Sequence, residues 1–147
     1  MSQAIVGGAM SMARRHEGTR LKSYLCPAGV WTIGVGATGR DIGPGLVWTL
    51  EQAIERLERD CVRSVGMAYK LCPILYGESD ARVVAVGDFV FNLGYPRLAA
   101  STMRRRINEG NWTAAASEAQ RWIWGGGKKL PGLIKRRAEM AEMLLAG

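Results

Sequence analysis

The fold of this chain is decided by residues 16–39, which read HEGTRLKSYLCPAGVWTIGVGATG. Within them, residues 26–29 read CPAG and place proline second and glycine fourth, as type I turns prefer. Strand-like residues flank this turn at 21–25 and 30–35. The stretch therefore predicts a β-hairpin, and the glycine-rich residues 36–45 predict an irregular loop or a frayed third strand.

Helical patterns lie on both sides of the hairpin. Before it, the small and apolar residues of 3–16 fall near one face at helical spacing. After it, Thr49 and Gln52 fit a capping box, in which each side chain hydrogen-bonds to the backbone of the other. Apolar residues follow at helical spacing, so we predict a long helix over 50–70.

The remainder of the chain, beyond a break at 72–79, shows only helical patterns. Within the last predicted helix, Lys135 and Glu139 are expected to pair at i,i+4. One helix, a hairpin and then several helices predict an α+β fold with its strands gathered early. The predicted C-terminal helices are an apolar one over 80–93, a short basic one capped by Ser101 and ending near Gly110, one over 112–123, and one from Pro131 to about Leu145.

Length and charge restrict the possible functions. The chain has 147 residues, enough for one substantial core but not for two full domains. Lys and Arg number 20 against 13 Asp and Glu, which gives a net charge of +7. A basic protein favours an anionic polymer as its partner. Nucleic acid, an acidic membrane surface and the bacterial cell wall all fit this charge.

Cysteine and histidine usage argues against two kinds of stabilising site. An odd count of three cysteines disfavours a disulfide framework, and a single histidine without a CxxC motif cannot build an ordinary zinc site. A disulfide between Cys61 and Cys72 stays open. No apolar run approaches the roughly 18 residues of a membrane helix. The N-terminus is a poor signal peptide because its positive charges follow its apolar stretch.

Three reactive side chains are expected to meet at the hairpin. Glu17 ends the first predicted helix, while Cys26 and Thr32 flank the turn on antiparallel strands. A carboxylic acid is the usual proton donor to a glycosidic oxygen, and a second group on the other face activates water or attacks the sugar. Spacing alone favours a simpler interpretation, namely a solvated helix-end carboxylate at Glu17 and a half-buried cysteine beside a turn at Cys26.

A nucleophilic cysteine with a histidine base is a further interpretation, with His16 as the base for Cys26. Helix neighbours at i and i+1 point about 100° apart, so His16 is expected to face away from the Glu17 side. This geometry disfavours a peptidase or an amidase.

Three segments resemble the motifs of one protein family. Residues 17–39 begin with Glu-Gly, and Cys26 and Thr32 follow at the spacing of that family's active-site signature. Residues 89–112, FVFNLGYPRLAASTMRRRINEGNW, resemble its Phe-Asn-Val/Leu-Gly, Ser-Thr and Asn-x-Gly-x-Trp motifs. Residues 118–145 resemble its Arg-Trp, Gly-Gly-Lys and Gly-Leu-x-x-Arg-Arg tail. The chain thus resembles the phage lysozymes, the endolysins of T-even, lambdoid and P22-like phages.

This resemblance implies a lysozyme-like fold within a single domain, 1–147. A β-rich lobe over about 17–48 and a helical lobe over about 70–147 would enclose an active-site cleft, with a linking helix over about 49–70 between them. The implied reaction is hydrolysis of the β-1,4 bond between N-acetylmuramic acid and N-acetylglucosamine in peptidoglycan, for host cell lysis.

The resemblance also implies roles for the hairpin residues. Glu17 would be the general acid, and Thr32 would position the attacking water or stabilise the product side. Cys26 departs from the best-known members, which have Asp there. A thiolate at that position can act as a nucleophile or orient water, so retention and inversion both stay open.

Substrate contacts and partners follow from the same resemblance. Thr38, Phe91 and Ser101 align with cleft positions and are predicted to bind substrate. The expected partner is the peptidoglycan polysaccharide, with no cofactor, no metal, no nucleic acid and no stable membrane insertion, and the protein is expected to be a monomer. Without an evident secretion signal, we expect accumulation in the host cytoplasm, release through a holin, and action on the cell wall in the periplasm.

Two other functions remain as alternatives. A catalytically inactive peptidoglycan-binding protein would have no need of an acid at Glu17. A basic, helical nucleic-acid-binding protein would account for the charge, but no recognisable reading motif is present. The basic runs at 104–106 and 128–129 are interpreted as solvated faces. Trp112, Trp122 and Trp124 are expected in the core or at the cleft edge.

Overall fold

The computed structural model describes residues 1–147 and has the α+β architecture that the sequence predicts. It contains seven α-helices, one 3₁₀ helix and two small hairpins. In chain order the elements are α1 (Gln3–Glu17), β1 (Arg20–Leu25), β2 (Trp31–Gly34), α2 (Leu50–Leu71), η1 (Pro73–Gly77), α3 (Asp80–Leu93), α4 (Tyr95–Ala99), α5 (Thr102–Asn108), α6 (Trp112–Ala119), β3 (Trp124–Gly125), β4 (Lys128–Lys129) and α7 (Pro131–Ala146).

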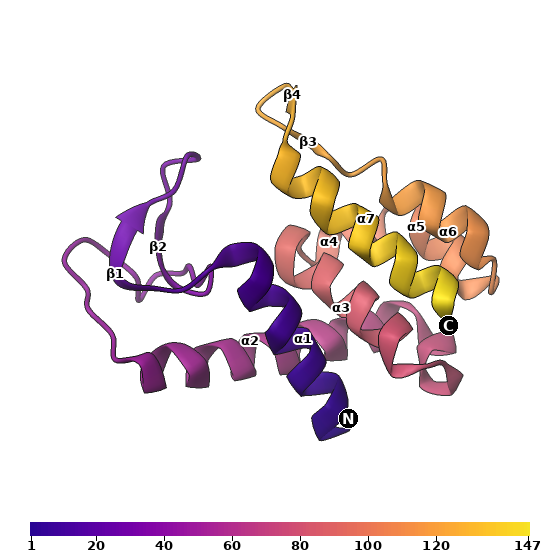
Figure 1. The fold of residues 1–147 in the computed structure, drawn as a ribbon, viewed down its shortest axis with the longest axis horizontal. Helices are drawn as coiled ribbons and strands as arrows, with labels where there is room; N and C mark the ends of the chain where they lie inside the picture. The colour runs from indigo at the N-terminus through magenta and orange to yellow at the C-terminus, as the bar shows by residue number, and fades with distance from the viewer.

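The long helix α2 connects two parts of the molecule (Figure 1). We call residues 20–48 the hairpin region and residues 72–147 the helical region. The predicted capping box is confirmed at the start of α2. The Thr49 hydroxyl oxygen accepts a hydrogen bond from the Gln52 N–H at 3.1 Å, and the Gln52 side-chain oxygen accepts one from the Thr49 N–H at 2.8 Å. These bonds satisfy backbone donors that the first helical turn leaves unpaired.

The β-hairpin is confirmed, with β1 and β2 antiparallel and Tyr24 opposite Thr32. Its turn closes through the Gly29 N–H, which donates to the Cys26 carbonyl at 2.8 Å. No full third strand follows. The segment after β2 makes only isolated bridges, one of them between Lys22 and Val47, in agreement with the expected irregular loop.

The central helix of the core is α3, which packs against α1, α2 and α7. A cluster of 27 buried residues surrounds it, whereas a separate cluster in the hairpin region contains only three. The crossing of α3 over α2 depends on Gly87. A Cβ atom at Gly87 would lie 2.8 Å from Cγ2 of Val65, closer than packed side chains approach.

Two details of the C-terminal part differ from the sequence-based prediction. Helix α6 ends at Ala119 rather than at 123, because the following residues leave the helix and lead into β3. The predicted glycine-rich loop forms the small β3–β4 hairpin, in which Gly126 and Gly127 both have positive φ. Two successive positive φ values are characteristic of the type I′ hairpin turn, which favours glycine.

None of the helices combines the length and the apolar character that a membrane crossing requires.

Candidate active site

Glu17 is the last residue of α1, and its carboxyl group rests against the loop after β2. A Cβ atom at Gly36 would lie 3.2 Å from both Cδ and Oε2 of Glu17. Gly36 also has a φ of 71°, which side chains rarely adopt. The missing side chain therefore makes room for the carboxyl group and brings the helix end against the hairpin region.

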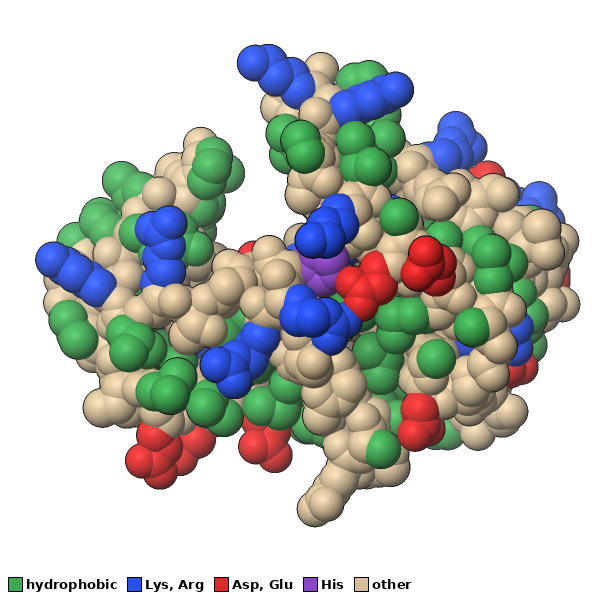
Figure 2. Space-filling view, viewed as in Figure 1, with side chains coloured by type: hydrophobic (Ala, Val, Ile, Leu, Met, Phe, Trp, Pro, Cys, Tyr) green, Lys and Arg blue, Asp and Glu red, His purple; other side chains and the backbone are tan.

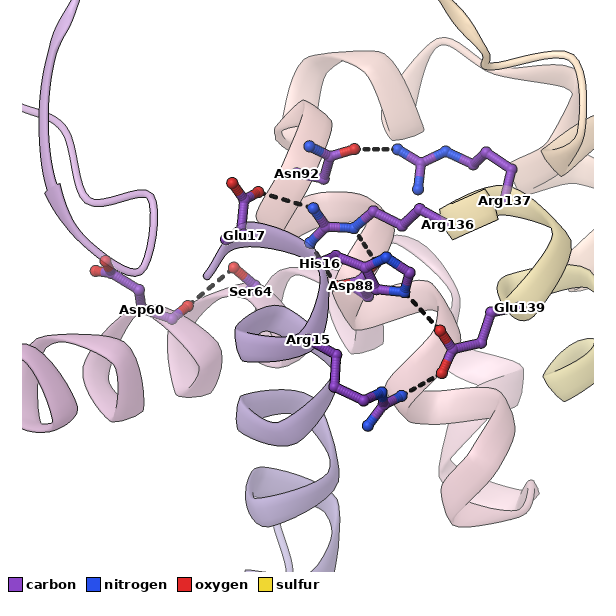
Figure 3. A network of polar contacts seen from close by, with 10 residues as sticks. All are labelled: Arg15, His16, Glu17, Asp60, Ser64, Asp88, Asn92, Arg136, Arg137 and Glu139. Atoms are coloured by element: carbon purple, nitrogen blue, oxygen red, sulfur yellow. Dashed lines mark hydrogen bonds and ion pairs between the residues drawn. The ribbon is translucent and has the colours of Figure 1, made fainter. Parts of the chain in front are cut away.

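The second partner of Glu17 is a buried arginine from α7 (Figure 3). Arg136 Nη1 donates to Glu17 Oε1 at 2.7 Å. The other side of the same guanidinium group forms a two-point contact with Asp88 of α3: Nε donates to Oδ2 at 2.8 Å and Nη2 to Oδ1 at 2.7 Å. Paired bonds of this kind fix the plane of a guanidinium group. Three helices thus determine where the Glu17 carboxyl group points.

The pKa of Arg136 reflects this pairing. Burial opposes its charge, but the hydrogen bonds and charges of Asp88, and then of Glu17, outweigh burial and raise the pKa. At the neighbouring Arg137 this compensation is incomplete. Burial lowers its pKa to about 10 against the opposing charges of Asp88 and Glu17, and its only side-chain hydrogen-bond partner is Asn92, while Nε and Nη1 have none.

Helix α7 contacts the end of α1 through a second side chain, the carboxylate Glu139. It contacts Arg15, and its Oε2 lies 2.5 Å from Nε2 of His16. Burial tends to raise the pKa of Glu139, but the hydrogen bonds from His16 and Arg15 lower it. The predicted Lys135–Glu139 pair is therefore wrong, because this tertiary contact takes the carboxylate. His16 contacts Glu139 while Glu17 contacts Arg136, so the two neighbours have different partners.

Cys26 and Thr32 lie together at the turn end of the β1–β2 hairpin. The pKa of the Cys26 thiol is lowered, mainly by the Val30 backbone N–H, with further hydrogen bonds from Ala28 and from the Thr32 side chain, against a smaller opposing effect of burial. The Thr32 hydroxyl also donates to the Val30 carbonyl at 3.0 Å. One hydroxyl proton serves one acceptor at a time, so ionisation of Cys26 would draw it to the sulfur.

The other two cysteines differ from Cys26 in environment. Cys61 and Cys72 are buried and free, so the possible disulfide between them is not formed. Burial is the main cause that raises their pKa values, to about 12 and about 11. Thiols of this kind are unreactive.

A notch separates the β1–β2 side of the molecule from the β3–β4 side (Figure 2). Two hollows lie near the Glu17 carboxyl group. One hollow, of about 270 Å³, is lined by Gly36, Thr38 and Phe91. The other, of about 490 Å³, is lined by Glu17 itself together with Asn92 and basic side chains of α1 and α7. Glu17 thus lines the second hollow, and its carboxyl group lies against Gly36, which lines the first.

The structure brings Thr38 and Phe91 to one hollow but places Ser101 elsewhere. The Thr38 carbonyl is held by Arg56 Nη2 of α2 at 2.8 Å. Ser101 is the N-cap of α5: its hydroxyl accepts from the Arg104 N–H at 3.0 Å and donates to the Leu98 carbonyl at 2.8 Å. It lines two other hollows, one beside α5 and one beside Trp122.

Sequence reasoning missed Asp88 and Arg136 as parts of the site. A signal for the pair was present, because Asp88 is the single acidic residue in the apolar segment 83–93. A buried carboxylate is rarely left unpaired, so this residue predicts a buried cation opposite it. No group of three or more His, Cys, Asp or Glu side chains is arranged to hold a metal ion.

Comparison with known proteins shows the family. The family model described as phage lysozyme matches residues 14–140, a span that contains the hairpin, Asp88 and Arg136. The chain belongs to the phage lysozyme family. Membership implies glycoside hydrolase activity and a peptidoglycan substrate, and it confirms the resemblance of the three sequence segments.

Individual relatives agree with this assignment. An endolysin of Acyrthosiphon pisum secondary endosymbiont phage 1 is 35% identical over 132 residues, covering 86% of this chain and 87% of that protein. A SAR-endolysin of bacteriophage PS119 is 32% identical, covering 98% of this chain and 91% of its own. Among solved structures, the muramidase domain of SpmX from Asticaccaulis excentricus is similar with a TM-score of 0.81 and 29% identity, covering 98% of this chain and 96% of that one. The lysozyme-like fold of the phage lysozyme family is therefore shared across the whole chain.

Proposed function

We propose that this phage lysozyme is a muramidase that hydrolyses the β-1,4 bond between N-acetylmuramic acid and N-acetylglucosamine in peptidoglycan and serves host cell lysis. The observation that carries the proposal is the position of Glu17, which lines a hollow of about 490 Å³ and whose carboxyl group is oriented by Arg136. A side chain placed in this way can reach a glycosidic oxygen in the cleft. The name of the similar muramidase domain agrees with this reaction.

In this proposal Glu17 donates its proton to the glycosidic oxygen as the bond to the anomeric carbon breaks. General acid catalysis of this kind contributes about 10²- to 10⁴-fold to a rate. The bond from Arg136 Nη1 occupies Oε1, so Oε2 is the oxygen left to carry the proton.

Cys26 and Thr32 act on the attacking water. The Cys26 thiolate, held by hydrogen bonds from Val30 and Thr32, accepts a proton from the water as its oxygen bonds to the anomeric carbon. Direct attack from the face opposite the leaving group gives an inverted product. Attack by the sulfur itself would instead give a glycosylated Cys26 and a retained product.

Three further side chains are proposed to contact the sugar chain, namely Thr38, Phe91 and Ser101. Thr38 and Phe91 line the same hollow beside Gly36, which supports a common role for them. For Ser101, the support is its alignment with the family alone, because its hydroxyl is engaged in capping α5. The protein is proposed to accumulate in the host cytoplasm, as a monomer, and to act on the wall after release into the periplasm. Relatives named SAR-endolysin belong to this same group of proteins.

The test of the function is clearing of purified cell walls, with identification of the reducing sugar released. Glu17→Gln is expected to fold and to lose about 10²- to 10⁴-fold in rate. Release of muramic acid at the new reducing end would support the bond assignment. A folded Glu17→Gln variant that clears walls at the wild-type rate would remove Glu17 from the mechanism, and wall binding without clearing by the wild type would favour the inactive binding protein.

The role of Cys26 is tested by substitution and alkylation. Cys26→Asp is expected to stay active, whereas Cys26→Ala is expected to lose much of its activity. Because its lowered pKa provides thiolate at lower pH than an ordinary thiol, iodoacetamide at pH 7 should modify Cys26 alone and stop clearing. Cys61 and Cys72 should stay unmodified, as mass spectrometry would show. Full activity of Cys26→Ala would show that the thiol contributes only to packing.

A further inference from the structure

One guanidinium group serves two carboxylates of unequal burial. The side chains of Arg136 and Asp88 are 4% and 1% exposed, whereas that of Glu17 is 27% exposed. Asp88 takes two hydrogen bonds from Arg136 and Glu17 takes one. Asp88 lies beneath the cleft, borders none of the hollows beside Glu17, and is therefore placed to act through Arg136 alone.

A buried cation has two opposing effects on a neighbouring general acid. The cation orients the carboxyl group, but an opposite charge within about 4–6 Å favours the ionised form and shifts its titration by about 1–3 pH units. An acid that ionises too early has no proton to give at the working pH. Arg136 alone would therefore orient Glu17 and disable it at the same time.

We propose that Asp88 is a positioning residue that resolves this conflict. Its two hydrogen bonds fix the guanidinium plane of Arg136, and its negative charge balances the positive charge that Glu17 would otherwise experience in full. Glu17 thereby keeps its orientation without meeting the full charge of the guanidinium group. This inference rests on the proposed role of Glu17 as the general acid.

The other charged groups around the pair increase the need for balance. Arg137, next to Arg136 on α7, is fully buried and brings a second guanidinium group whose charge Asp88 also opposes. Cys61 of α2 stays neutral because its pKa is about 12. On α1, Arg15 and His16 are paired with Glu139 of α7. Asp88 is thus the one buried carboxylate that faces both guanidinium groups.

The experiment is the pH profile of wall clearing by Asp88→Asn, which keeps the size of the side chain and removes its charge. The alkaline limb, where the acid loses its proton, is expected to move to lower pH by about one unit or more. Clearing at acid pH should fall less than clearing at neutral pH, because only the loss of orientation acts there. The matched control is Asp80→Asn, the same change in the first turn of the same helix, which should leave the limb in place. A purely structural role would lower the rate equally at every pH, and an unmoved limb in a folded Asp88→Asn variant overturns the proposal.

A double variant, Asp88→Asn with Arg136→Gln, removes both charges and covers the case in which the single variant does not fold. Its alkaline limb is expected close to that of the wild type. A limb higher by about a unit or more would show that Arg136 had acted on Glu17 unbalanced, against the proposal.

Carbon-13 NMR of the Glu17 carboxyl group reads the same effect without any activity. It should show the Asp88→Asn variant losing the Glu17 proton at lower pH. If the wild type clears no walls, the proposed function fails, while this titration still decides the part played by Asp88.

Discussion

The two reactive side chains, Glu17 at the end of α1 and Cys26 in the hairpin region, are held in opposite ways. Glu17 is oriented by the buried charges of Arg136 on α7 and Asp88 on α3. Both of these helices contribute residues to the core cluster of 27. Cys26 lies at a turn, and backbone N–H groups of that same turn are the main cause that lowers the pKa of its thiol. The comparison teaches that the environment of the acid depends on tertiary structure, whereas that of the thiol depends on local structure. The contact of Gly36 with the Glu17 carboxyl group joins the hairpin region to the end of α1.

The largest effect is expected where the buried charges are broken. Arg136→Ala leaves Asp88 buried without a partner, so the free energy of unfolding should fall by about 3–5 kcal/mol. Urea unfolding followed by circular dichroism measures this. The neighbouring, exposed Lys135→Ala should change stability by no more than about 0.5 kcal/mol. Adding Asp88→Ala to Arg136→Ala should recover part of the loss. Equal stability of Arg136→Ala and Lys135→Ala would show that the Arg136–Asp88 pair does not hold the helices together.

A smaller, regional effect is expected from the core of the hairpin region. Ile33→Ala removes the main side chain of the three-residue cluster and should cost about 2 kcal/mol, since so small a cluster can partly collapse. Hydrogen exchange should show the loss in residues 20–48 while the amides of α3 keep their protection. Val30→Ala, at an exposed position of the same region, is the control. Equal loss of protection in α3 would contradict the separation of the two regions.

The smallest effect is expected at the junction between the regions. Thr49→Ala removes one half of the capping box and should cost about 1 kcal/mol. For a chain of this size that lowers the melting temperature by about 2–4 °C. Thr49→Ser keeps the hydroxyl oxygen and should melt close to the wild type. A serine variant as unstable as the alanine variant would assign the effect to the threonine methyl group instead.

Local signals in the sequence predicted local structure well. The Pro27–Gly29 turn, the Thr49–Gln52 box and the bounds of α3 depend on residues a few positions apart, and all are confirmed. The ion pairs of the candidate site could not be predicted in this way. Arg136 lies 48 positions from Asp88 and 119 from Glu17, and only the packing of α7 on α3 and α1 brings them together.

The same reason explains the wrong prediction for Glu139. Its helix neighbour Lys135 offered an exposed pair of small worth, whereas Arg15 and His16, more than a hundred positions away, offer a partly buried one. Family motifs carried the functional assignment to Glu17, Cys26 and Thr32, but they gave no reason for Asp88. That residue gains its meaning only when the partner across the core is known.

The uninterrupted length of α2 has a consequence for how this chain can change. Its 22 residues rise by about 1.5 Å and turn by about 100° each, so the helix spans about 33 Å in one register. A single inserted residue would swing the whole hairpin region around the helix axis by more than a quarter of a turn. The loops can absorb insertions, but α2 cannot, because its length and its rotation per residue together set where the hairpin region lies relative to the helical region.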